Sequence, residues 1–460
     1  MNSNSQDKFM KHEIIEAAKL YMNEKFLRCV KKANPNADSK SIVDRATRRP
    51  IEQVLMALQD LDEHNLEQIQ QFVDTHLHEP GIEIIRAELT DWVEHPRFLK
   101  NIQSEELRHF CTALNRVWLD LYKKLDMSKL EHECVTSHLP MRHPFIVPGG
   151  RFIEIYYWDT YWTIEGLLVC GMIDTVRQMI ENFVFFIKKF GFIPNGSRIY
   201  YLNRSQPPYF AQMVMRYYDH CMACDHLDAT AKQEIENFVL TDAYKCILIE
   251  YRYWTRQKSV EILVDKRSKR KFKFSRYTVN TKMARPESYF EDMHTASQCR
   301  TDAQKHKLIL SELSELNGDD LKAKLFKRLA AKRRYAINKL LWSKENCCWS
   351  DYNVKTGRLT DHFYASNLAP LWFDMRPPSG VRAADVIAKH RAVFDGYDAG
   401  VPVSLLKTTQ QWDFNNVWAP NQHSYIMMLL KHEPRTALKL AKKFFNTVYH
   451  GWKRTGMIYE

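Results

Sequence analysis

A run of aromatic, acidic and basic residues between Pro148 and Trp162 carries groups that suit a pocket for a sugar ring. A pyranose has apolar faces on which aromatic rings stack, and a rim of hydroxyls that charged and amide side chains bind. Arg151 and Asp159 flank Phe152 and Trp158 in this way. From composition alone, a sugar-binding loop and a core aromatic cluster with one buried ion pair are equally good interpretations.

Helical periodicity surrounds this run. Between Asp174 and Phe190 the apolar residues recur at three- and four-residue spacing, which predicts an amphipathic helix. Asp174 or Thr175 could cap its start, and Gly191 could end it. Leu308–Leu316 and Leu321–Leu341 predict an αα-hairpin around a turn at Asn317-Gly318. Further helices are expected at His12–Lys31, Ile51–Leu61, Glu105–Leu125, Ala231–Arg252, Gly380–Phe394 and Pro434–Tyr449.

The composition agrees with a helical chain. Only 14 of the 460 residues are glycine, which is few for the many turns of an antiparallel β-protein. Loops rich in Trp, Tyr, Pro, Asn and Arg lie between the expected helices, at 144–162, 192–210, 284–292 and 409–422. This alternation predicts one helical domain whose loops gather at one end.

The sequence has no apolar run of the ~18–20 residues that a membrane span requires. The polar start, Met1 to Asp7, has no apolar segment of the kind that a secretory signal contains. We therefore expect a cytoplasmic protein, although an incomplete N-terminus of a secreted protein would give the same observation.

Two other features are weaker indications of function. Cys221 and Cys224 form a CxxC pair flanked by His220 and His226, but no second pair of zinc ligands follows at matching spacing, so ordinary thiols are the better interpretation. The formal charge is +12, and seven Lys and Arg residues lie between Lys266 and Arg276. Nucleic-acid binding is one interpretation. A solvated loop or hairpin is favoured because no nucleic-acid-binding motif surrounds the cluster.

Several stretches in register resemble the trehalases of glycoside hydrolase family 37. Residues 148–162 read PGGRFIEIYYWDTYW, which resembles the first family signature, and Gln411 to Pro420 resembles the second with substitutions at Phe414, Asn415 and Val417. Shorter matches are Phe192–Gly196, Asn203–Pro208, Arg285–Tyr289 and Gly400–Leu405. The resemblance extends from about residue 35 to the last residue.

The resemblance implies an (α/α)6 barrel that hydrolyses α,α-trehalose to two glucose molecules with inversion. It also implies a site with three arginines, each of which offers a rigid fork of donors to hydroxyls and carboxylates. The family needs no metal or cofactor. The substrate-binding residues that the resemblance assigns are Arg151, Phe152, Trp158, Asp159, Asn195, Arg204, Arg285, Glu287 and Trp412.

The catalytic carboxyl groups match less well. Inverting hydrolysis needs two of them about 6.5–9.5 Å apart, one as acid and one as base. The segment that carries the family's acid has no counterpart, and roughly 50 residues, the length of one helix-loop-helix unit, are missing from the family pattern near Lys305. The general acid is therefore not found. Glu460, the last residue printed, aligns with the general base.

We therefore expect an α,α-trehalase with an incomplete (α/α)6 barrel. The alternative is a catalytically impaired relative that binds trehalose without efficient hydrolysis, since an enzyme without its acid loses a factor on the order of 10²–10⁴. Residues 1–34 are expected to form an N-terminal helical segment, and residues 35–460 the trehalase-like domain. Trehalose is the expected partner, and neither nucleic acid nor a membrane span is expected.

Overall fold

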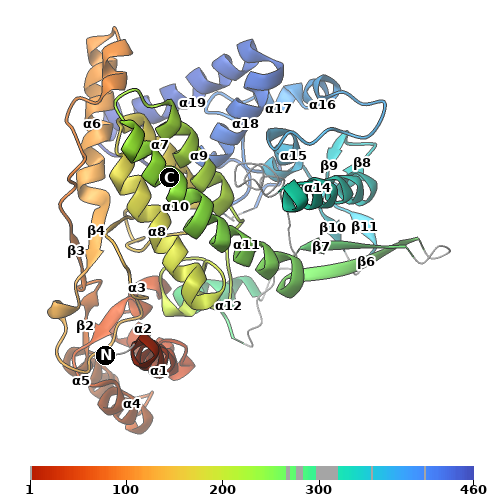
Figure 1. Ribbon diagram of the computed structural model, residues 1–460. Coiled ribbons are helices and arrows are strands. Elements are labelled where there is room, and N and C mark those ends of the chain that lie inside the picture. The colour runs from red at the N-terminus through yellow and green to blue at the C-terminus, as the bar shows by residue number, and fades with distance from the viewer. Residues whose placement is uncertain are drawn as a thin grey trace. The chain divides into compact units, whose positions relative to one another are not determined.

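The computed structural model describes residues 3–265, 270–275, 283–296, 320–353, 356–408 and 411–459. They form two compact units, Met1–Tyr253 with Tyr277–Thr301, and Trp254–Arg276 with Asp302–Glu460. Helices dominate both units and the strands are few and short (Figure 1). The prediction of an all-α class is confirmed. No helix in these ranges is long and apolar enough to cross a membrane.

Three helices that lie side by side make the core of the first unit (Figure 1). They are α7 (Asp159–Cys170), α8 (Ile173–Phe190) and α9 (Phe210–Ala223). The predicted apolar stripe of α8 is buried, and the helix ends at Gly191 with φ +79°, as expected of a residue without a Cβ. The expected cap was wrong, because Met172 precedes the helix without a side-chain cap and Asp174 lies within the first turn.

Three of the expected helices are interrupted or shortened in the structure. His12–Lys31 is divided between α1 (Ser3–Tyr21) and α2 (Glu24–Ala33), because the Asn23 side chain accepts the N–H groups of Lys25 and Phe26 and starts a new helix. The expected helix Glu105–Leu125 becomes α6 (Glu105–Leu121) followed by the strand β4 (Tyr122–Leu125). Ala231–Arg252 consists of α10 (Ala229–Phe238) and α11 (Tyr244–Arg252) joined by one π-helical turn, Val239–Ala243.

The remaining helices of the first unit are α3 (Ser39–Val43), α4 (Ile51–Asp60), α5 (Leu66–His76) and α12 (Tyr289–Ala296), and the unit also contains short antiparallel strands. β1 (Arg45–Thr47) pairs with β2 (Leu77–Pro80). β3 (Ile84–Arg86) pairs with β4, which pairs with β5 (Phe145–Ile146). Since β5 ends two residues before Pro148, this small sheet fixes where the aromatic run begins.

The second unit packs around its own apolar core. A cluster of buried residues that includes Trp349, Leu371, Phe394 and Met428 joins its helices. These are α14 (Asp320–Leu340), α15 (Ala369–Trp372), α16 (Ala383–Lys389), α17 (Arg391–Asp395), α18 (Ala419–His432) and α19 (Pro434–Thr455). The strands β8 (Trp342–Ser343) and β9 (Cys348–Trp349) pair, as do β10 (Tyr352–Asn353) and β11 (Arg358–Leu359). The expected helix Leu308–Leu316 lies outside the described residues.

Three residues of the basic cluster, Arg270, Lys271 and Lys273, lie on a β-ribbon of the second unit, and the other four lie outside the described residues. β6 (Ser259–Asp265) pairs antiparallel with β7 (Arg270–Ser275). On β7 the side chains alternate: Lys271 and Lys273 are exposed, while Phe272 and Phe274 pack toward Ala336 of α14. For Lys271 and Lys273 this alternation is that of the solvated face of a two-stranded ribbon.

Candidate functional site

Backbone hydrogen bonds bring the first three predicted site segments together in the first unit. Ser197 donates its N–H to the Ile155 carbonyl at 3.0 Å, and its hydroxyl oxygen accepts the Ile155 N–H at 3.1 Å. Tyr157 N–H donates to the Asn195 carbonyl at 3.2 Å, and Asn195 N–H donates to the Arg204 carbonyl at 3.0 Å. Asn195 therefore connects the aromatic run to the loop that carries Arg204.

Gly196 is required where these segments meet. A Cβ at this position would lie 3.0 Å from two atoms of the Tyr201 ring and 3.1 Å from the Ile155 carbonyl oxygen. Because both distances are shorter than ordinary van der Waals contact, only glycine lets the Tyr201 ring pack this closely on the backbone.

Arg204 and Glu287 form an ion pair. Nη2 of Arg204 donates a hydrogen bond to Oε1 of Glu287, and both side chains are largely buried. The guanidinium also lies over the Tyr201 ring, 4.9 Å from its centroid. Arg204 is therefore held both by a carboxylate and by an aromatic face, which is a favourable setting for a cation.

Arg285 is held by a residue that the sequence interpretation did not single out. Its backbone N–H, Nε and Nη2 donate to the Asp292 carboxylate on α12 at 3.1, 2.8 and 2.5 Å. Burial raises the pKa of Asp292, but the hydrogen bonds and charge of Arg285 outweigh it and lower the pKa below its usual value. The seven-residue separation gave no periodic signal that could have identified this pair.

Arg151 and Phe152 lie at the edge of the same site. The Arg151 guanidinium is over the Phe152 ring at 4.9 Å and its Nη1 is 3.6 Å from Oδ2 of Asp38. The Phe152 ring meets the Tyr156 ring edge-on, with centroids 5.6 Å apart. The Tyr156 and Tyr201 hydroxyl oxygens are 2.7 Å apart, so this contact continues to the ring that supports Arg204.

Trp158 and Asp159 stand at the start of α7. The backbone N–H of Trp158 donates to the Gln206 side-chain oxygen at 2.9 Å, and the Trp158 ring meets the Trp162 ring edge-on, with centroids 5.2 Å apart. Asp159 is half-buried in the first turn, where the helix dipole stabilises a negative charge. The aromatic run was expected as a loop to Trp162, but the helix begins at Asp159 because Thr160 to Cys170 include five residues that it buries.

Eight of the nine predicted substrate-binding residues thus lie in the first unit, where the contacts above link Arg151, Phe152, Asn195, Arg204 and Glu287. Trp412 belongs to the second unit, where its ring stacks on Trp418 at 3.9 Å and is 41% exposed. Glu460 lies outside the described residues, so its predicted role as the base stays a prediction. Within the described ranges, no group of three or more His, Cys, Asp and Glu residues is placed to hold a metal ion.

A cluster of buried charged side chains includes Glu154 of the aromatic run. Lys40 donates from Nζ to Asp44 and, at 2.8 Å, to Oε2 of Glu154. Arg198, which is 0% exposed, has its Nε 3.4 Å from the same Glu154 oxygen and donates from Nη1 to Glu83 at 3.1 Å. We call Lys40, Asp44, Glu83, Glu154 and Arg198 the buried ion cluster.

The charge state of Glu154 follows from this cluster. Burial raises the pKa of Glu154, but the positive charges of Lys40 and Arg198 outweigh that effect and lower the pKa below its usual value. One signal for this arrangement is present in the sequence: an acidic residue lies between Ile153 and Ile155 in an otherwise apolar and aromatic stretch.

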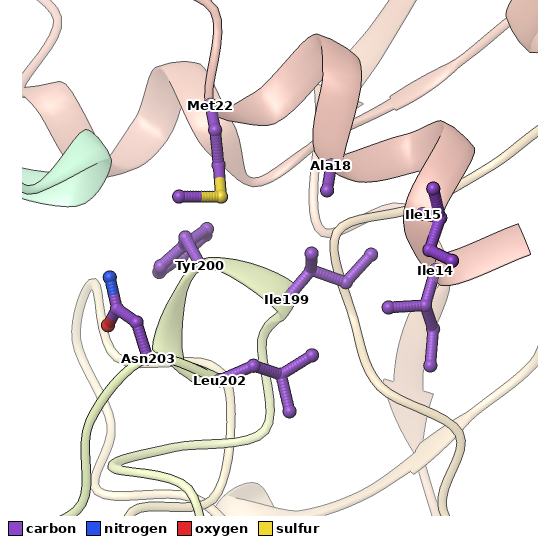
Figure 2. Close-up of a pocket in the computed structure, with 8 residues that line it drawn as sticks. All are labelled: Ile14, Ile15, Ala18, Met22, Ile199, Tyr200, Leu202 and Asn203. Atoms are coloured by element: carbon purple, nitrogen blue, oxygen red, sulfur yellow. The ribbon is translucent and has the colours of Figure 1, made fainter. Parts of the chain in front are cut away.

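An apolar groove lies between the loop 199–203 and the helix α1. Figure 2 shows Ile199, Leu202 and Asn203 facing residues of α1 across a cavity of about 260 Å³. Ile14, Ile15 and Ala18 of α1 line it, together with Met22, which follows the helix. This lining has few polar groups, so the groove is unsuited to a sugar.

Comparison with known proteins gives a consistent result over nearly the whole chain. The family model described as trehalase matches residues 34–320 and 304–460. Human trehalase is 31% identical over 504 residues, which cover 96% of this chain and 83% of the relative. The trehalase of Bombyx mori is 32% identical over 486 residues, covering 92% and 81% respectively.

A solved structure extends the likeness to the fold. The neutral trehalase Nth1 from Saccharomyces cerevisiae superposes with a TM-score of 0.57 at 18% identity, covering 82% of this chain and 87% of that chain. The two matches to the family model meet at residues 304–320, the stretch where we expected an interruption. The alignment with the human protein is also longer than this chain, so some positions of the relative have no counterpart here.

Proposed function

This chain belongs to the trehalase family, and we propose that it hydrolyses α,α-trehalose to two glucose molecules with inversion. The observation that carries the proposal is the linked set of arginines, carboxylates and aromatic rings in the first unit, built from the segments that resemble the family's motifs.

The geometry supports a division of roles. Phe152 and Trp158 offer ring surfaces for the faces of a glucose unit, while Asp159, Asn195 and Glu287 offer acceptors for its hydroxyls. Arg151, Arg204 and Arg285 supply fixed donors, and two of them are already oriented by carboxylates. Trp412 of the second unit is proposed as a further ring for sugar stacking, which its exposure permits.

Two carboxylates of this set, those of Glu287 and Asp292, are engaged by arginines. A general acid must hold its proton near neutral pH, which requires a raised pKa. Arg285 lowers the pKa of Asp292, and the Glu287 carboxylate pairs with Arg204. Asp292 is therefore not the proton donor, and Glu460 remains the proposed base.

The decisive experiment measures glucose release and trehalose binding on the same purified protein. We expect glucose above background, with NMR of the fresh product showing an inverted anomer. Heat on calorimetric titration with trehalose but no glucose would favour the impaired, sugar-binding alternative. Neither glucose nor heat from the folded protein would refute the proposal.

We also propose a cytoplasmic location, with secretion as the alternative. Nine cysteines in the described part of the chain are free thiols, as is usual in a reducing compartment. Fractionation of cells that express the full-length transcript, with thiol labelling of the recovered protein, tests this proposal. Recovery from the medium would contradict it. The boundary between an N-terminal segment and the main domain at residues 34 and 35 likewise stays a proposal.

A further inference from the structure

Two tyrosine hydroxyls connect the buried ion cluster to the site. Tyr156 donates its hydroxyl hydrogen to Oε1 of Glu154, and its oxygen is 2.7 Å from the Tyr201 hydroxyl. A phenol has one hydrogen to donate. Because Tyr156 gives its hydrogen to the carboxylate, Tyr201 must be the donor in the bond between the two tyrosines.

The direction of these two hydrogen bonds, from Tyr201 to Tyr156 and from Tyr156 to Glu154, has a consequence for Arg204. Glu154 is fixed by Lys40 and Arg198, so the negative end of the chain cannot move. Two consecutive hydroxyl bonds polarise each other toward the carboxylate, which anchors the Tyr201 ring and increases electron density on it. The Arg204 guanidinium rests on that ring at 4.9 Å, where added electron density strengthens its attraction to a cation.

We propose that Glu154, Tyr156 and Tyr201 are positioning residues that act through one hydrogen-bonded relay to hold Arg204 in its working orientation toward Glu287. The relay rests on the proposed function, because Arg204 is placed in the site by that proposal. None of the three residues needs to touch the sugar to perform this task.

The relay has a matched internal control in Tyr200. Its side chain is fully buried beside Tyr201, with ring centroids 4.6 Å apart, and its hydroxyl donates to Oδ1 of Asp44 at 2.7 Å. Replacing Tyr200 with phenylalanine removes a buried hydroxyl from the ion cluster, as Tyr156→Phe does, but leaves the path from Glu154 to Tyr201 intact.

The experiment compares glucose release by Tyr156→Phe, Tyr201→Phe, the double variant and Tyr200→Phe. We expect Tyr156→Phe and Tyr201→Phe each to lose about tenfold in kcat/KM, mainly in kcat. A misaligned guanidinium raises the energy of the transition state most, because binding there depends most on alignment. The double variant should lose no more than either single variant, since both changes break one chain. Tyr200→Phe should keep the wild-type value. Losses that multiply in the double variant, or an equal loss in Tyr200→Phe, would overturn the relay.

A second measurement separates failure of the relay from failure of the proposed function. If the wild-type protein releases no glucose, thermal unfolding of Tyr156→Phe, Arg204→Lys and their combination still tests the relay. The Tyr156 hydroxyl bonds Glu154 and Tyr201 rather than Arg204. Coupling through the relay therefore predicts non-additive shifts in Tm. Additive shifts would refute it without reference to any substrate.

Discussion

Arg204 donates a hydrogen bond from Nη2 to Oε1 of Glu287, while the other oxygen of that carboxylate, Oε2, is buried without a hydrogen-bond partner among the described residues. A buried acceptor of this kind has unused capacity. The Glu287 carboxylate thus keeps one oxygen for a further donor without breaking its bond to Arg204.

Arg204→Lys keeps the positive charge but loses the planar fork. We expect kcat/KM for trehalose to fall by on the order of 10²-fold, because a single ammonium cannot bond Glu287 and a substrate hydroxyl in fixed directions. Arg216→Lys is the control, since Arg216 also pairs with a carboxylate, donating two hydrogen bonds to Glu165 on the surface. Equal activity of the two variants in the glucose assay would show that Arg204 is not part of the site.

Gly196→Ala should damage the site without unfolding the chain. The new Cβ displaces the Tyr201 ring, and the Arg204 support with it, by a few tenths of an ångström. We expect kcat/KM to fall by about tenfold. Gly451→Ala in α19, where a Cβ meets nothing within 4 Å, should leave activity unchanged and stabilise the helix by about 0.5–1 kcal/mol. Full activity of Gly196→Ala would show that this close approach is unimportant.

Lys40→Met tests how much the buried ion cluster contributes to the free energy of unfolding. The substitution leaves Asp44 and Glu154 with less positive charge in the protein interior, and we expect a loss of about 3–5 kcal/mol of unfolding free energy in a denaturant titration. Lys188→Met removes a lysine from a half-exposed pair with Asp242 and should cost less than about 1 kcal/mol. Similar losses in the two variants would mean that burial does not strengthen the cluster.

The stability of the protein should fall as the pH drops below about 6.5, the usual pKa of histidine. His138 is buried, donating from Nδ1 to the Leu139 carbonyl at 2.6 Å with Nε2 3.1 Å from the Ser197 hydroxyl oxygen. Burial and the nearby charges of Arg198 and Lys40 lower its pKa well below the usual value.

The unfolded chain therefore binds a proton in this pH range that the folded chain does not, so acid favours unfolding. The slope from this residue is at most about 1.4 kcal/mol per pH unit. His138→Gln should flatten the dependence of Tm on pH between 6.5 and 5, whereas replacement of the exposed His64 with Gln should not. A wild-type Tm that is constant over this range would contradict the prediction.

Local patterns were sufficient to predict the long helices and the site segments, but not the contacts between distant segments. The apolar spacing of 174–190 placed α8 within one residue of its observed ends. Periodicity could not show that Asn23 would divide α1 from α2 through its side chain, or that Tyr122 would leave α6 for a sheet. Competing local hydrogen bonds and strand pairing decided those cases.

The same limit applies to the site. Arg151, Arg204 and Arg285 were identified by the motifs around them, but their partners Asp38, Glu287 and Asp292 are set by folding. Lys40 and Arg198 gave no signal, because an isolated charge in a sequence looks the same whether it is solvated or buried in a cluster. Only the three-dimensional arrangement shows that Glu154 needs both of them.

The uneven composition of the buried ion cluster, three carboxylates against two cations, limits how this segment could be transplanted. A designer who grafted residues 148–162 onto another helical scaffold would bring Glu154 without Lys40, which lies 114 positions away, or Arg198, 44 positions away. The graft would bury an unbalanced acid and lose the fixed end of its tyrosine chain. The signature is thus one part of a set that has to be inherited, exchanged or engineered together.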